Sequence, residues 1–314
     1  MKFFITGGAG YIGSHLGTAL QNAGHQVKIY DDFSKGLEKR CSNRFSQVIQ
    51  GNILDFELLK KQMEGQDVVI HLAAKKSVEE SVANPNYYYE NNVIGSKNVI
   101  NAMISNGINK IIFSSTAAVY SSSNNELLTE NYLLSPNSPY GLNKLEVENF
   151  ISDIVKTNSI AAISLRYFNV VGCLESQLAD NSTENLFPKV LNKIKHNQPV
   201  EIYGNDYPTN DGTCVRDYIH IADLVSAHIE LINYFEIGKH QIFNVGSGTG
   251  YSVSEVLNSI EKQINNKFEI KVTNRRPGDV AKLVASIDKL KNTTGWSPTE
   301  TLDSMVKSDL THKL

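Results

Sequence analysis

Cysteine is scarce in this sequence, and its three cysteines lie far apart. Cys41, Cys173 and Cys214 form no CxxC pair and no cluster with histidine. The pattern therefore indicates neither a disulfide framework nor a zinc site, and we expect no metal ion. A reducing cytoplasm is the expected location for such a chain.

Long apolar runs, repeats, low-complexity tracts and charged tails are also lacking. No stretch reaches the roughly eighteen apolar residues that a membrane span needs, and the N-terminal apolar run soon meets its glycines. The net charge of −3 offers no basic field for nucleic acid, although local arginines can still bind a compact phosphate ligand. We expect an unprocessed, soluble protein with neither nucleic acid nor membrane as a partner.

The 314 residues, of which 41% are hydrophobic, suffice for a large core. In the first half, apolar strand-like runs alternate with helical patterns, which predicts an α/β fold with a doubly wound parallel sheet. The expected strands are Lys2–Thr6, Gln26–Tyr30, Gln47–Gln50, Asp67–His71, Lys110–Ser115 and Ile160–Arg166. The expected helices are Tyr11–Ala23, Asp55–Glu64, a stretch within Tyr87–Ser105, and Tyr140–Lys156.

After Arg166 the alternation becomes irregular. Residues 173–185 and the turn cluster 205–212 are typical of loops, so they predict a smaller lobe built from insertions. We expect residues 1–170 to form a Rossmann-type nucleotide-binding domain, to which residues 213–246 return. Residues 171–212 and 247–314 are expected to form a C-terminal substrate-binding lobe.

The first expected strand leads into a glycine-rich turn and then a helix. Gly8, Gly10 and Gly13 spell G-x-G-x-x-G, while Gly7, Gly10 and Gly13 give the spacing of a related fingerprint. In both alignments glycine lets the backbone approach a pyrophosphate, which then sits at the N-terminus of the following helix.

A carboxylate pair, Asp31 and Asp32, ends the second expected strand about twenty residues beyond the glycines. A carboxylate there accepts hydrogen bonds from a ribose diol and repels a 2′-phosphate, which favours NAD over NADP. Lys35, Lys39 and Arg40 follow closely and could hold that phosphate, so NADP stays an alternative.

Tyr140 and Lys144 are four residues apart and share one face of an expected helix. A free tyrosine ionises near ~10, so a base at neutral pH needs roughly 4 kcal/mol of preferential phenolate stabilisation. A nearby cation supplies part of that stabilisation. The strand before this helix ends in Ser114, Ser115 and Thr116, whose hydroxyls should face the cofactor at the carboxyl edge of the sheet.

These motifs resemble the extended short-chain dehydrogenase/reductase family. The runs Leu165–Asn169, Gly204–Asp223 and Arg275–Asp279 narrow the resemblance to UDP-glucose (UDP-galactose) 4-epimerases, and it covers almost the whole chain. It implies NAD-dependent 4-epimerisation of a UDP-sugar by a homodimer. Tyr140 would be the acid/base, Lys144 would bind the nicotinamide ribose and lower the phenol pKa, and Thr116 would hydrogen-bond the sugar.

The resemblance also implies two sets of binding residues. Those implied for the cofactor are Gly7, Gly10, Tyr11, Ile12, Gly13, Asp31, Asp32, Asn52, Ile53, Leu72, Ala73, Ala74, Lys76, Asn91, Tyr140, Lys144 and Phe168. Those implied for the substrate are Thr116, Tyr140, Asn169, Asn185, Leu186, Tyr203, Arg216, Arg276, Asp279 and Leu283.

Several positions depart from the family pattern. Thr116 stands where many of these epimerases have serine, Asn52 replaces a common aspartate, Ala74 replaces a common glycine, and Ser121 stands where glycine is usual. Leu283 matches a position that controls access of N-acetylated sugars. Leucine there is intermediate in size, so a UDP-N-acetylhexosamine 4-epimerase stays an alternative.

Two other activities need side chains that this sequence lacks. A dehydratase would need an Asp-Glu pair after the threonine, where this chain has Ala117 and Ala118, and neither side chain can transfer a proton. Decarboxylases use a glutamate that is also missing here. A net reductase that exchanges its cofactor, or a non-catalytic NAD-binding module, remains as a further alternative.

Overall fold

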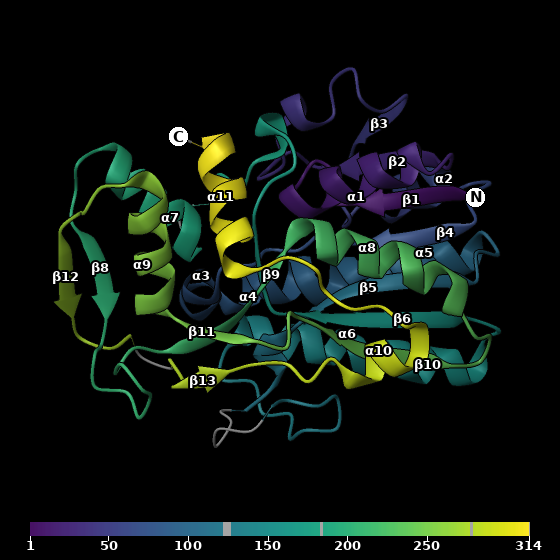
Figure 1. Ribbon diagram of the computed structural model, residues 1–314. Helices are drawn as coiled ribbons and strands as arrows, with labels where there is room; N and C mark the ends of the chain where they lie inside the picture. Colours follow the sequence, from purple (N-terminus) through teal and green to yellow (C-terminus); the bar gives the residue numbers. More distant parts are fainter. Residues whose placement is uncertain (122–126, 183–184, 277–278, 314) are drawn as a thin grey trace. The chain divides into compact units, whose positions relative to one another are not determined.

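The computed structural model describes residues 1–121, 127–182, 185–276 and 279–313 (Figure 1). Part of the Arg275–Asp279 motif and of the 173–185 loop therefore lies outside the described residues. Contacts within the chain divide it into two compact units. Unit 1 comprises Met1–Val119, Leu134–Arg166 and Ala227–Phe243, and unit 2 comprises Tyr120–Leu133, Tyr167–Ser226 and Asn244–Leu314.

Unit 1 is built on a seven-stranded sheet with the order β10-β6-β5-β4-β1-β2-β3. β1 pairs in parallel with both β2 and β4, and the parallel pairing continues to β3 on one side and β5 on the other. The strand order reverses beside β1, which is the arrangement that creates a binding crevice at the carboxyl edge of an open sheet. The strands are β1 (Lys2–Thr6), β2 (Gln26–Asp31), β3 (Gln47–Gln50), β4 (Val68–His71), β5 (Lys110–Thr116), β6 (Ala161–Tyr167) and β10 (His240–Val245).

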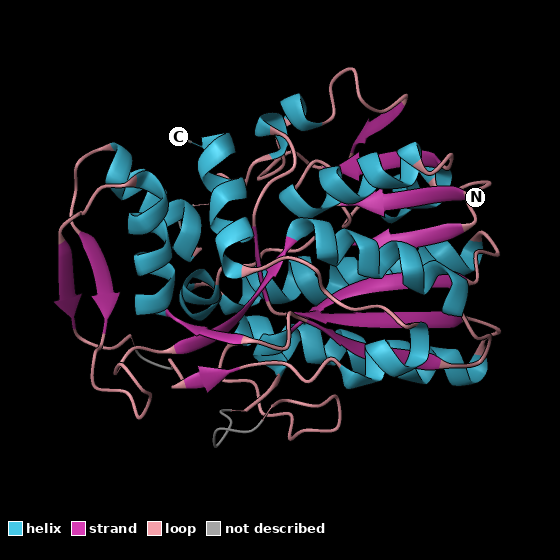
Figure 2. Ribbon diagram, viewed as in Figure 1, coloured by secondary structure: helices cyan, strands magenta, loops and turns pink. Residues whose placement is uncertain are grey.

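Helices flank this sheet, as Figure 2 shows. A buried cluster that includes Val69, Ile111, Val99 and Val147 joins the strands to α5 and α6. The helical segments are α1 (Tyr11–Asn22), η1 (Glu38–Arg40), α2 (Phe56–Gln62), α3 (Val78–Ala83), α4 (Pro85–Tyr89), the π-helix η2 (Glu90–Ile94), α5 (Gly95–Ser105), η3 (Ala117–Val119), α6 (Pro139–Thr157), the part of α8 (Ile221–Leu231) from Ala227 onward, and η5 (Ile232–Tyr234).

The sequence pattern predicted this part of the fold closely. All six expected strands are present with ends within one residue of those expected, and the doubly wound parallel sheet is confirmed. The stretch expected within 87–105 is interrupted, because a π-helix turn at Glu90–Ile94 separates α4 from α5. The short helix α3 was not expected from the pattern.

Unit 2 has β9 (Val215–His220) at the centre of a small four-stranded sheet. β11 (Gly250–Ser252) pairs with β9 antiparallel, while β13 (Lys282–Leu283) and β7 (Asn169–Val171) pair with it in parallel. A separate pair joins β8 (Val200–Tyr203) to β12 (Ile270–Thr273). The remaining segments are η4 (Ser176–Leu178), α7 (Leu186–Lys195), α9 (Val253–Ile264), α10 (Asp288–Thr294) and α11 (Leu302–Lys313).

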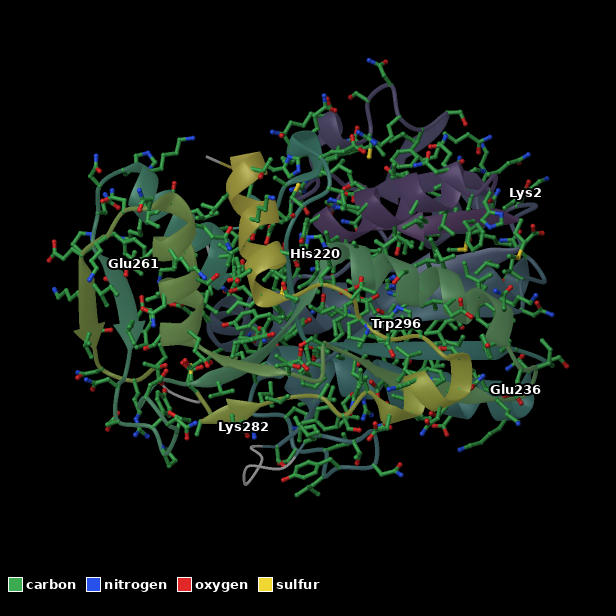
Figure 3. All side chains as sticks on the ribbon, viewed as in Figure 1. Lys2, His220, Glu236, Glu261, Lys282 and Trp296 are labelled. Atoms are coloured by element: carbon green, nitrogen blue, oxygen red, sulfur yellow. The ribbon has the colours of Figure 1, made fainter. Side chains whose placement is uncertain are left out.

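The core of unit 2 lies where its helices meet these strands. Phe187 of α7, Val256 of α9 and Met305 of α11 are buried together with Tyr218 of β9. His220, labelled in Figure 3, ends β9 and shares a hydrogen bond of 2.9 Å between its Nε2 and the Oγ of Ser308 in α11.

The expectation that residues 213–246 return to the main sheet is only half right. β10 joins the seven-stranded sheet, but β9 belongs to the small sheet of unit 2. A buried carboxylate in the middle of β9 connects this strand to the rest of unit 2. Asp217 accepts hydrogen bonds from the backbone N–H groups of Ser247, Gly248 and Ala285 at 2.7, 3.0 and 3.1 Å, and these donors all lie in unit 2.

We predict that Asp217→Asn destabilises unit 2. Each carboxylate oxygen faces donors, so an amide NH₂ must point at backbone N–H groups, which costs about 1–3 kcal/mol. The fluorescence of Trp296, the only tryptophan, reports urea unfolding of this unit because its indole N–H donates to Ser226 Oγ within unit 2.

Asp153→Asn is the control, since this aspartate is exposed and, among the residues that the structure describes, forms its ion pair with Lys156 of the same helix. It should leave the urea midpoint nearly unchanged. An unchanged midpoint for Asp217→Asn would contradict the role given to this carboxylate.

Candidate functional site

The turn after β1 has the shape of a pyrophosphate cradle. Gly7 has φ +70°, and a Cβ there would lie 2.7 Å from the backbone nitrogen of Ala73. A Cβ on Gly13 would lie 2.4 Å from the Gly7 carbonyl oxygen. α1 begins at Tyr11, and its N-cap, Gly10, has no side chain to bond the first amides. These amides and the helix dipole suit an anionic diphosphate, so the turn fits a dinucleotide.

The carboxylates at the end of β2 shape the neighbouring loop. Asp31 is buried, and its two oxygens accept from the N–H groups of Ala9 and Phe33, each at 2.9 Å. Burial raises the pKa of Asp31, and the two backbone hydrogen bonds oppose that rise. Each oxygen keeps a second lone pair for a ribose hydroxyl. Arg40 is buried with its guanidinium 3.4 Å from the Ala9 carbonyl oxygen, whereas Lys35 and Lys39 are exposed.

The residues expected around adenine follow β3. Asn52 accepts the N–H of Leu54 at 2.9 Å through its side chain, and its amide lies 3.4 Å from Asp32 Oδ2. The backbone carbonyl of Asn52 accepts from the phenol of Tyr30. Ile53 is buried against α5, where Gly95 leaves it room. An aspartate could accept the same hydrogen bond from Leu54, but it could not donate to Asp32 as the Asn52 amide does.

The segment expected near the phosphates follows β4. The N–H of Leu72 donates to the Thr6 carbonyl at 3.1 Å, which holds this segment beside the glycine turn. Ala73 approaches Gly7, Ala74 is half-buried, and Lys76 is exposed. Asn91, in the π-helix, donates to the Tyr87 carbonyl.

The expected base, Tyr140, lies in the first turn of α6 and meets the end of β5. Tyr140 is half-buried and hydrogen-bonded to the side chain of Thr116. Ser138 caps the N-terminus of α6 by accepting from Gly141 N at 3.2 Å, and Pro139 occupies the first helical position, so Tyr140 is held in the first turn. Burial raises the pKa of Tyr140, and the hydrogen bond from Thr116 lowers it.

Lys144 lies one turn further along α6 and is buried. Its ammonium donates to the Ser114 carbonyl at 2.7 Å and lies 4.8 Å from the centre of the Phe113 ring. Burial lowers the pKa of Lys144 to about 7, while Glu148 raises it. The hydrogen bond from Thr116 lowers the phenol pKa and the Lys144 ammonium is engaged by a backbone carbonyl, so a role of Lys144 in lowering that pKa stays a prediction.

Glu148 is a site residue that the sequence reading missed. It lies one further turn along the same helical face and forms a buried ion pair with Arg166 at 2.6 Å. Ser115 Oγ also donates to it. The four-residue spacing of Tyr140, Lys144 and Glu148 was the available signal. His71, at the end of β4, is also buried, and its pKa is lowered to about 3 by burial and by Lys144.

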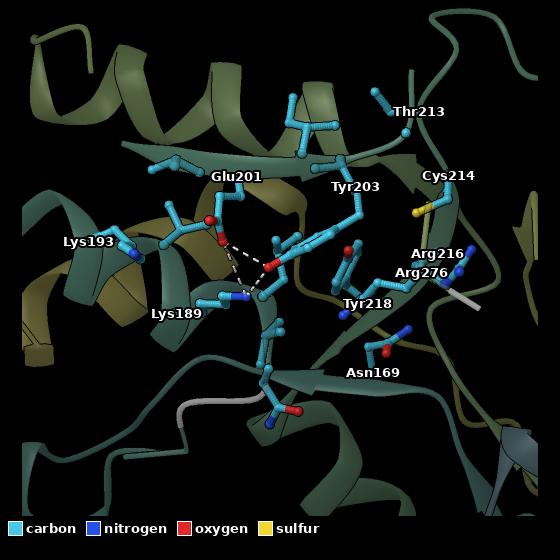
Figure 4. Close-up of a pocket in the computed structure, with 18 of the residues that line it drawn as sticks. Asn169, Lys189, Lys193, Glu201, Tyr203, Thr213, Cys214, Arg216, Tyr218 and Arg276 are labelled. Carbon is cyan, nitrogen blue, oxygen red and sulfur yellow. Dashed lines mark hydrogen bonds and ion pairs between the residues drawn. The ribbon is translucent and has the colours of Figure 1, made fainter. Parts of the chain in front are cut away.

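The expected substrate residues gather at one pocket in unit 2, shown in Figure 4. Six of them line it: Asn169, Asn185, Leu186, Tyr203, Arg216 and Arg276. Asp279 braces two of these, since its carboxylate lies 3.4 Å from Arg216 Nη2 and accepts from Arg276 Nε at 2.9 Å. Leu283 is paired with Arg216 in the β13–β9 ladder. Thr116, Tyr140 and Lys144 belong to unit 1, while Phe168 belongs to unit 2.

The pocket contains a polar chain that the sequence did not reveal. Lys189 of α7 donates to the phenol oxygen of Tyr203 at 2.6 Å, and that phenol donates to Glu201 at 2.8 Å (Figure 4). The guanidinium of Arg276 lies 4.8 Å from the centre of the Tyr203 ring. Lys189 stands three residues after Leu186, so helical spacing from a predicted site residue could have identified it.

Arginine, tyrosine and asparagine side chains thus line the same pocket. Arginines suit a diphosphate through bidentate hydrogen bonds, and an aromatic ring suits the flat face of a base. Asparagines on β7 and at the start of α7 offer both donors and acceptors. The pocket can therefore hold a nucleoside diphosphate group.

Comparison with known proteins gives a consistent result. Residues 3–246 match the model of the NAD dependent epimerase/dehydratase family. The chain is 39% identical over 303 residues to the UDP-glucose 4-epimerase of Corynebacterium glutamicum, which covers 96% of this chain and 92% of that protein.

Solved structures agree in fold over the full length. The UDP-glucose-4-epimerase from Stenotrophomonas maltophila, with bound NAD and formylated UDP-arabinopyranose, has a TM-score of 0.93 at 32% identity and covers 99% of this chain and 97% of its own. The UDP-glucose 4-epimerase from Bifidobacterium longum, in complex with NAD⁺ and UDP, has a TM-score of 0.92 at 34% identity and covers 100% and 98%. The chain belongs to the NAD-dependent epimerase/dehydratase family.

Proposed function

We propose that this protein is an NAD-dependent UDP-hexose 4-epimerase, which interconverts UDP-galactose and UDP-glucose through a transient 4-keto sugar. The observation that carries the proposal is the hydrogen-bonded pair of Tyr140 and Thr116 at the end of β5, followed by Ala117 and Ala118. A phenol and a hydroxyl can exchange a proton with a sugar, and the two alanines offer no second acid or base for elimination.

Unit 1 is proposed to hold NAD. The glycine turn and the start of α1 would carry the pyrophosphate, and Asp31 the adenosine ribose. Asn52 and Ile53 would contact adenine, while Leu72, Ala73, Ala74, Lys76 and Asn91 would surround the phosphates and nicotinamide. NAD, when bound, supplies a hydride acceptor that later returns the hydride. The NAD bound in related structures supports this assignment.

Tyr140 is proposed to move the reacting proton. As the phenolate, its oxygen takes the proton of the C4 hydroxyl while the C4–H bond breaks, and the resulting phenol returns the proton when that bond forms again on the opposite face. Thr116 orients the hydroxyl through its own side-chain oxygen. Because the hydride lost from C4 is returned to C4, there is no net redox change, and cofactor exchange is unnecessary in each cycle.

Unit 2 is proposed to anchor the uridine diphosphate. Arg216 and Arg276 would bind the diphosphate, Tyr203 would lie beside uracil, and Asp279 would keep both guanidinium groups in place or accept ribose hydroxyls. The chemistry requires the sugar to turn about this anchor while it is a ketone. UDP bound to the Bifidobacterium longum protein supports a UDP ligand here.

Incubation with UDP-galactose and, separately, with UDP-N-acetylgalactosamine tests the proposed function. We expect UDP-glucose to form from the first without added reductant or oxidant. A dehydratase would release a deoxy-keto sugar, and a net reductase would consume reduced cofactor. If neither substrate is epimerised by protein that retains NAD, the proposal is wrong and a non-catalytic NAD-binding module is favoured.

We predict that Tyr140→Phe lowers kcat by about 10²–10⁴-fold, because it deletes the proton acceptor and keeps the ring. NAD content and thermal stability should stay near wild type, and kcat is measured with UDP-galactose. Tyr234→Phe is the control, since it makes the same chemical change in η5, and the adjoining Phe235 lies near Lys110, at the end of β5 opposite Thr116. Activity close to wild type would remove Tyr140 from the mechanism.

Leu283 is predicted to set the tolerance for N-acetylated sugars. A smaller side chain leaves more room beside the 2-position, so Leu283→Ala should raise kcat/KM for UDP-N-acetylgalactosamine relative to UDP-galactose, and Leu283→Tyr should lower it. The expected change is about 10–200-fold. If neither variant changes the ratio of the two kcat/KM values from that of the wild type, Leu283 does not control access and is simply a packed apolar side chain.

We also propose that the protein is a cytoplasmic homodimer that pairs through helices of unit 1. α3, α4 and α6 pack together and expose apolar side chains, with Val78 49%, Val82 63%, Tyr87 44% and Leu142 56% exposed. Such a patch on neighbouring helices is typical of an association surface. Among the described residues, no helix is long and apolar enough to cross a membrane.

Leu142→Asp should convert the dimer to a monomer, because it places a charge in a desolvated contact. Sedimentation velocity at several protein concentrations measures the change. Ile237→Asp is the control, since Ile237 is similarly exposed in unit 1 but lies outside these helices. A wild-type protein that sediments as a monomer would rule out the proposed dimer.

A further inference from the structure

Lys75 makes a contact that the proposed function does not use. Its ammonium donates to Ser34 Oγ at 2.7 Å. Ser34 lies three residues beyond the end of β2, and Lys75 lies four residues beyond the end of β4. The neighbouring Lys76, which the family resemblance selects, is exposed.

The strand order shows what this contact crosses. β1 lies between β4 and β2 in the sheet, so the ends of β4 and β2 are separated by two strand spacings, about 10 Å. The glycine turn Gly7–Gly10 continues directly from β1. A side chain that joins the loop after β4 to the loop after β2 therefore spans the carboxyl edge of β1, where the pyrophosphate cradle lies.

Both ends of this connection are fixed. The backbone of Lys75 is held by Asn92 of the π-helix, which accepts its N–H at 2.8 Å and donates to its carbonyl at 2.9 Å. Ser34 is held by Asp32, whose Oδ1 accepts both the N–H of Ser34 at 2.9 Å and its hydroxyl at 2.6 Å. The ammonium also lies 5.7 Å from the centre of the Tyr87 ring.

We propose that the Lys75 side chain, with its hydrogen bond to Ser34, is a strap across the dinucleotide groove that retains NAD. The inference depends on NAD binding at the glycine turn, as proposed above. The strap must open for the cofactor to enter or leave. When closed, the strap would also place the positive charge of Lys75 near the phosphates of bound NAD and near Asp31 and Asp32. An epimerase that returns its hydride in every cycle gains from slow cofactor exchange, since a lost NADH would strand the ketone.

Exchange of bound NAD for isotopically labelled NAD tests the strap, with mass spectrometry of the released cofactor as the readout. Lys75→Met should accelerate exchange about tenfold, the usual effect of losing one charge-assisted hydrogen bond. Ser34→Ala should also accelerate it. The double variant should exchange no faster than Lys75→Met, because both changes remove the same bond. The assay contains no sugar nucleotide, so its result is separate from that of the epimerase test.

Lys60→Met is the control, since it removes the same charge from an exposed lysine in α2 of the same unit. It should exchange like wild type. Exchange in Lys75→Met no faster than in this control overturns the proposal. Exchange that is fast in Lys75→Met but unchanged in Ser34→Ala also overturns it, because the lysine would then hold the cofactor directly rather than through the strap.

Discussion

The position of β1 between β2 and β4 is the constraint on which the nucleotide-binding half of this protein depends. Parallel ladders on both edges of β1 bring the ends of three strands to one side of the sheet. Gly7 then has to pass so close to Ala73 that a side chain would not fit. The glycine turn, the loop that contains Asp31 and the segment after β4 are neighbours because they follow three adjacent parallel strands.

Burial determines the chemistry of the side chains on helix α6. Tyr140, Lys144 and Glu148 lie on one face of α6, and the neighbouring strands exclude water from the last two. The buried lysine needs a carbonyl partner, which Ser114 provides, and the buried glutamate needs a cation, which Arg166 provides. Losing either partner would leave a buried charge uncompensated, so this face is held rigidly where Tyr140 meets Thr116.

In unit 2, two carboxylates hold separate segments of the chain together. Asp217 binds two separate loops to β9, and Asp279 braces two arginines at the pocket. Each carboxylate accepts several hydrogen bonds or ion pairs at once, so a short, irregular set of strands acquires a defined shape. The Lys189–Tyr203–Glu201 chain fixes the aromatic wall of the same pocket.

The sequence by itself determined the features that depend on local periodicity and short motifs. Alternating apolar runs placed all six strands of the first half, and the glycine spacing placed the turn at the start of α1, because these signals come from residues near one another in the chain. The six pocket residues were implied by the family resemblance of the sequence, although their convergence was not visible.

Only the tertiary structure decided which distant segments pair. β9 pairs within the small sheet of unit 2, where Asp217 accepts hydrogen bonds from donors in two later loops. The partners of Lys144 and Glu148, and the reach of Lys75 to Ser34, likewise depend on strand order and burial. Such contacts join residues far apart in the chain, so their energies appear only once the sheet has brought the strand ends together.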